Sequence, residues 1–131
     1  MSFYCLKIRY NKIQTHLFYL ALAVENDTFQ EIVRRVVEVA HPDKVILFGS
    51  AARGETGYDS DIDLLVVASE PVHRGHLTEK IYMNLIGLGQ AVDIVVVTQA
   101  DVEKYRNNDY LVIAPALREG KVLYDRESTA A

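Results

Sequence analysis

Three aspartates, Asp61, Asp63 and Asp93, are the residues best suited to chemistry in this 131-residue chain. Asp61 and Asp63 open an apolar run, and the alternation of side chains along a strand places both carboxylates on one face. Solvated acids at a strand edge would give the same pattern. A divalent cation explains it better, because Mg²⁺ binds through one or two carboxylates together with substrate phosphates. We therefore predict a magnesium site at Asp61 and Asp63.

Gly49 and Ser50 follow an earlier apolar run at residues 45–48. Glycine allows a sharp turn and a close approach of the backbone to a ligand. Ser50 is predicted to begin a short helix that continues to Glu55, whose free N–H groups and hydroxyl would suit phosphate oxygens. A simple helix cap would also explain Ser50. Arg53 lies one turn further on, where reaching a phosphate and pairing with Glu55 remain equally open.

Apolar periodicity predicts the elements that would position these residues. Short runs indicate strands and spaced apolar residues indicate helices. The expected strands span 45–48, 64–67, 91–97 and 122–124, and the expected helices span 27–40, 50–55, 77–88, 99–107 and 109–118. This alternation is typical of an α/β sandwich with a small mixed sheet. If the strands at 64–67 and 91–97 are neighbours, Asp93 becomes a third carboxylate beside the first two. Without those two acids, Asp93 would be interpreted as a solvated residue at the start of a strand.

Gly49-Ser50, ten further residues, and then Asp61-x-Asp63 resembles the signature of the DNA polymerase β-like nucleotidyltransferase superfamily. The fuller string GSAARGE…SDIDLLV is similar to its minimal nucleotidyltransferase branch, and the resemblance covers residues 26–125. It implies the nucleotidyltransferase fold, two Mg²⁺ ions, and ATP as the substrate. The residues to which it gives a role are the catalytic and metal-binding Asp61, Asp63 and Asp93, and the nucleotide-contacting Gly49, Ser50, Arg53 and Ser60.

The resemblance also implies a partner. Members of the minimal branch are paired with a HEPN-domain ribonuclease toxin, and the implied activity is AMP transfer to a tyrosine hydroxyl of that toxin within a hetero-oligomer. A chain of this length is expected to take its acceptor from another chain or a small molecule. Three alternatives stay open: transfer to a small molecule of the aminoglycoside type, an antitoxin that only binds, and one subunit of a larger transferase.

Composition narrows the class of protein. The net charge is -4 and no basic patch is evident, so direct nucleic-acid binding is not expected. The single cysteine, Cys5, fits a reducing, cytoplasmic location. The apolar run at 17–24 is too short to cross a bilayer, so no membrane association is expected. We expect a nucleotidyltransferase domain at 26–125, preceded by an extension at 1–25 and followed by a frayed tail at 126–131.

Overall fold

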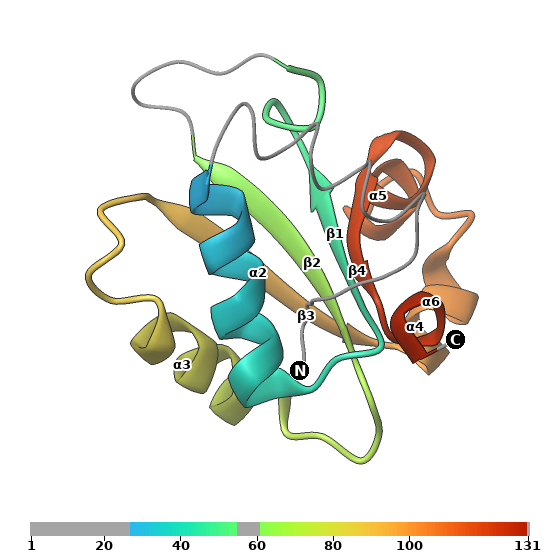
Figure 1. Ribbon diagram of the computed structural model, residues 1–131. Helices are drawn as coiled ribbons and strands as arrows, with labels where there is room; N and C mark the ends of the chain where they lie inside the picture. Colours follow the sequence, from blue (N-terminus) through green and yellow to red (C-terminus); the bar gives the residue numbers. More distant parts are fainter. Residues whose placement is uncertain (1–26, 55–60, 131) are drawn as a thin grey trace.

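A four-stranded mixed sheet forms the centre of the computed structural model, which describes residues 27–54 and 61–130 (Figure 1). Its strands are β1 (Lys44–Phe48), β2 (Ile62–Ala68), β3 (Val92–Thr98) and β4 (Lys121–Asp125). They lie in the order β3-β2-β1-β4. Strand β1 runs antiparallel to β2 and to β4, whereas β2 and β3 are parallel. The predicted α/β class and mixed sheet are confirmed.

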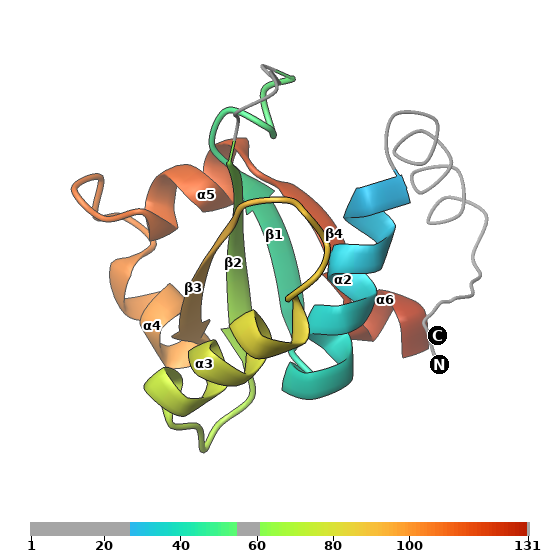
Figure 2. The same ribbon diagram turned by 90° about the vertical axis from the view of Figure 1, so that its left-hand side faces the viewer.

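Helices cover both faces of this sheet (Figure 2). Helices α2 (Asp27–Ala40) and α3 (Arg74–Asn84) pack on one face. Helices α4 (Gln99–Tyr105) and α5 (Ile113–Glu119) pack on the other. A short helix, α6 (Arg126–Ala130), follows β4. The result is a sandwich of three layers, with the sheet in the middle.

Strand β2 shows why the sheet is buried on both sides. Leu64 and Val66 point into the core beneath α2 and α3, while Leu65 and Val67 point into the core beneath α4 and α5. All four side chains are essentially inaccessible to water. A strand covered on both faces appears in sequence as a continuous apolar run, which is the pattern that predicted it.

The first helix and the capping box of α4 form as predicted. The amphipathic pattern of α2 buries Phe29, Ile32 and Val36 on one stripe. Thr98 and Asp101 satisfy each other's backbone N–H groups at the start of α4, at 3.1 and 3.0 Å. This box fixes the chain directly after β3.

Two predictions near the C-terminal end need correction. The helix expected from Asp109 begins only at Ile113, and Asp109 pairs instead with Arg118 at 2.8 Å. Pro115 then lies in the first turn, where a proline needs no backbone N–H. In place of the expected frayed tail, α6 begins at Arg126, whose backbone N–H donates to the carbonyl of Asp43 at 2.9 Å. The expected N-terminal extension lies outside the described residues.

Within residues 27–54 and 61–130, no helix combines the length and the apolar character needed to cross a bilayer.

Candidate active site

The parallel pairing of β2 with β3 places Asp63 directly opposite Asp93. Asp63 is partly buried, and Asp93 is exposed on the edge strand. Burial raises the pKa of Asp63, and the negative charges of Asp93 and Asp61 raise it further. A hydrogen bond between the Asp63 and Asp93 carboxyl groups acts in the same direction. The sheet therefore holds two carboxyl groups in contact where their charges oppose each other.

Asp61 lies immediately before β2 and is exposed. The residue between the two acids, Ile62, is buried, and its N–H donates to the carbonyl of Ala91 at 3.0 Å. This bond ties the beginning of β2 to the beginning of β3. Asp61 is close enough to Asp63 for its charge to raise the pKa of that carboxyl group. The three acids predicted from sequence therefore lie at one end of the sheet, where β2 and β3 begin.

Gly49 follows the last residue of β1, at this same end of the sheet. Phe48 pairs with Asp63 in the antiparallel register, and Gly49 follows with a φ of +76°. A Cβ atom at this position would press into the Asp63 Oδ2 atom and lie 3.3 Å from Asp63 Cγ. Both the backbone conformation and the space therefore favour glycine. The predicted sharp turn is present. The group closest to the position of a Cβ is the Asp63 carboxylate, and the approach of Gly49 to a ligand stays a prediction.

The segment after Gly49 is not the short helix that the sequence predicted. Its N–H groups form successive hydrogen bonds of the tight-turn type: Ala52 to Gly49, Arg53 to Ser50 and Gly54 to Ala51, at 3.1 to 3.2 Å. Glycines with positive φ stand at both ends of these turns. These turns use the N–H groups of Ala52, Arg53 and Gly54. A phosphate contact through the hydroxyl or the backbone N–H of Ser50 remains a prediction.

The other predicted contacts are less well defined. Arg53 is exposed in the turn, and its role toward phosphate remains a prediction. Ser60 lies outside the described residues, as do Glu55 and the loop between them.

The donor set suits Mg²⁺ bound together with a nucleotide. The described residues contain no group of three histidine, cysteine or acidic side chains arranged as a complete metal site. They do contain the Asp63 and Asp93 pair, and Mg²⁺ uses one or two carboxylates with substrate phosphates. A cation would also neutralise the repulsion that raises the Asp63 pKa. The Asp63 and Asp93 pair therefore fits the donor chemistry of Mg²⁺, and the role of Asp61 as a further ligand stays a prediction.

Comparison with known families identifies the fold. The profile of the family described as "Polymerase beta, Nucleotidyltransferase" matches residues 30–129. The chain belongs to this family. The match runs from α2 into α6 and includes all four strands, so the nucleotidyltransferase domain contains Gly49 and the three aspartates. No curated protein matches the chain in sequence.

Two solved structures are similar to this chain. A proposed nucleotidyltransferase from Sulfolobus solfataricus is similar, with a TM-score of 0.52 and 23% identity over 93% of this chain and 96% of that one. A toxin-antitoxin complex with AMP-PNP gives a TM-score of 0.48 and 20% identity over 80% of this chain and 79% of that one. The first likeness supports the nucleotidyltransferase fold, and neither assigns a substrate.

Proposed function

We propose that this nucleotidyltransferase transfers AMP from ATP to a tyrosine hydroxyl of a partner HEPN toxin and thereby acts as its antitoxin. One observation carries the transferase part: β2 and β3 pair so that Asp63 faces Asp93, against Gly49 at the end of β1. Such an acidic pair costs free energy in a site without a function. The partner part rests on the similarity of the string GSAARGE…SDIDLLV to the minimal branch of the superfamily.

The two carboxylates differ in exposure, and this suggests different roles. Asp63 is partly buried between β1 and β3, a position suited to holding the triphosphate through bound Mg²⁺. Asp93 is exposed on the outer strand, where an incoming hydroxyl can reach it. Bound Mg²⁺ would supply charge neutralisation at the phosphates. Asp93 would accept the proton as the hydroxyl oxygen bonds to the α-phosphorus and the bond from that phosphorus to pyrophosphate breaks.

The decisive experiment combines the protein, ATP, Mg²⁺ and a HEPN protein as the acceptor that the proposal requires. Intact-mass spectrometry should show adenylate additions on a tyrosine of the partner. Asp93→Asn should slow the transfer by about 10²- to 10⁴-fold, because an amide cannot accept the proton. Asp109→Asn is the matched control, since Asp109 is an exposed acid between α4 and α5 whose carboxylate pairs with Arg118 at 2.8 Å.

Each other outcome selects an alternative. A partner that stays unmodified yet is inhibited stoichiometrically by the wild type and by Asp93→Asn would replace the transferase proposal with a binding-only antitoxin. Modification of an aminoglycoside, supplied as a competing acceptor, in place of the partner would assign the small-molecule activity.

A further inference from the structure

Tyr82 joins α3 to the edge strand at the residue that follows Asp93. Its hydroxyl accepts a hydrogen bond from the backbone N–H of Ile94 at 2.9 Å. Among the strands of residues 27–54 and 61–130, β3 pairs only with β2, so none of these strands receives the outward N–H groups of its other edge. An edge N–H without a protein partner must turn to water. Tyr82 supplies that partner at the peptide group that follows Asp93.

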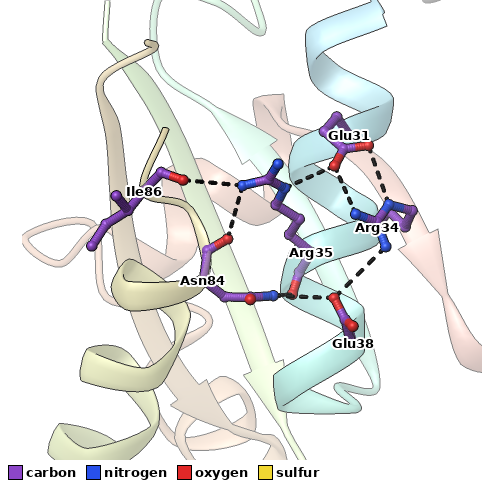
Figure 3. Close-up of polar contacts among 6 residues, drawn as sticks. All are labelled: Glu31, Arg34, Arg35, Glu38, Asn84 and Ile86. Atoms are coloured by element: carbon purple, nitrogen blue, oxygen red, sulfur yellow. Dashed lines mark hydrogen bonds and ion pairs between the residues drawn. The ribbon is translucent and has the colours of Figure 1, made fainter. Parts of the chain in front are cut away.

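The end of α3 is in turn held by α2 (Figure 3). The Arg35 guanidinium donates to the carbonyl oxygens of Asn84 and Ile86, both at 3.2 Å. Asn84 returns a bond from its amide to the Arg35 carbonyl at 2.9 Å. Glu31 orients the same guanidinium at 2.7 Å. These carbonyls lie at the C-terminal end of α3, two and four residues beyond Tyr82. The helix that carries the Tyr82 hydroxyl is therefore held in place by α2.

Sequence reasoning missed Tyr82. Its neighbour Ile81 is fully buried, whereas Tyr82 is 40% exposed and resembles an ordinary surface aromatic. Only the packing of α3 along β3 shows that its hydroxyl meets the chain next to Asp93. A tyrosine that was there for apolar packing alone would not need its hydroxyl at this position.

We propose that Tyr82 is a positioning residue that fixes β3 so that Asp93 stays opposite Asp63. The inference rests on the proposed role of Asp93 in transfer. Without the hydroxyl, the Ile94 N–H bonds to water, and the outer edge of β3 loses this hydrogen bond to α3. The Asp93 carboxylate then samples positions away from the reacting oxygen. Replacing a residue that holds a metal ligand or a base in position through a hydrogen bond typically lowers affinity or activity by about 10- to 100-fold.

The test compares Tyr82→Phe with Tyr110→Phe in the full chain. Both variants lose one hydroxyl and keep the ring, but Tyr110 is 98% exposed and lies in the turn before α5. Four quantities are measured: kcat for transfer to the partner, KM for ATP in that transfer, hydrogen exchange of the Ile94 amide, and the urea midpoint of unfolding. Tyr82→Phe should lower kcat by about tenfold with little change in KM, and should speed exchange at Ile94. Tyr110→Phe should change neither.

A double-mutant cycle with Asp93→Asn separates positioning from general destabilisation. If Tyr82 acts through Asp93, Tyr82→Phe should cause little further loss in the Asp93→Asn background. An equal loss in both backgrounds would overturn the inference, as would a kcat indistinguishable from that of Tyr110→Phe. Active wild type with an unaffected Tyr82→Phe removes only this inference, whereas a wild type that transfers nothing removes the proposed function and this inference with it.

Discussion

Replacing Gly49 by alanine should damage the proposed metal and nucleotide site more than it damages the fold. The new Cβ would be driven into the Asp63 Oδ2 atom, which is the free end of a side chain and can rotate away. The carboxylate would then leave the position opposite Asp93. Gly89→Ala is a close control, because Gly89 has a φ of +72° against +76° for Gly49, and a Cβ there meets no atom within 4 Å.

The backbone contribution should be nearly the same in both variants. An alanine in the left-handed region costs about 1–2 kcal/mol. The smaller conformational freedom of the unfolded chain returns about 0.4–1 kcal/mol. Both variants should therefore lose on the order of 1 kcal/mol of unfolding free energy, which lowers the melting temperature by roughly 4 °C. Gly49→Ala should in addition bind Mg²⁺ and nucleotide about tenfold more weakly, which corresponds to about 1.4 kcal/mol.

Urea unfolding and titration of Mg²⁺ with a non-hydrolysable ATP analogue measure the two effects separately. The expected result is a similar urea midpoint for the two variants and a selective loss of ligand affinity in Gly49→Ala. Equal affinities in the two variants would refute the argument that Gly49 sets the position of the Asp63 carboxylate. A much larger loss of stability in Gly49→Ala would show that Asp63 cannot rotate away.

Two further predictions concern stability. A hydrogen bond from Arg34, with smaller contributions from Arg35, lowers the pKa of Glu31 from 4.5 to about 2. Glu31→Gln should therefore lower the free energy of unfolding at pH 7, by less than about 1 kcal/mol because the group is partly exposed. Urea unfolding at a series of pH values should show this difference vanish as the pH falls from 4.5 toward 2. Gly120→Ala should lower the free energy of unfolding, measured with urea, by about 1–3 kcal/mol. The new Cβ would clash with the Ala116 carbonyl and lie 2.8 Å from the Leu47 carbonyl oxygen, and neither backbone can rotate away.

The strands were predictable because the central sheet is buried on both faces. Residues 64–67 and 91–97 could be read as strands since each carries a nearly unbroken apolar run, and both contribute to the two cores. The aspartates were recognisable because they are charged residues next to these apolar runs. Asp63 and Asp93 each interrupt the beginning of such a run, and the parallel register then brings them together. The fold and the acidic pair were therefore accessible to pattern alone.

The features that sequence reasoning missed depend on contacts between distant segments. The turn at Ser50 was taken for a helix because its residues have ordinary helix propensity, whereas Gly49 and Gly54 confine it with positive φ at each end. Helix α6 was missed because its first N–H donates to the carbonyl of Asp43, far away in sequence. Tyr82 was missed for the same reason, since its partner at Ile94 belongs to the next strand.

The arrangement of the strands indicates which carboxylate is more sensitive to change. Asp63 belongs to β2, which is paired on both sides and packed on both faces, so its backbone has little freedom. Asp93 belongs to β3, which has one neighbouring strand, and its own side chain is exposed. Since the proposed proton acceptor lies on the less constrained strand, changes along α3 should alter the rate of transfer more than they alter nucleotide binding. Changes beneath β2 should reduce stability first, because they remove buried contacts from both cores.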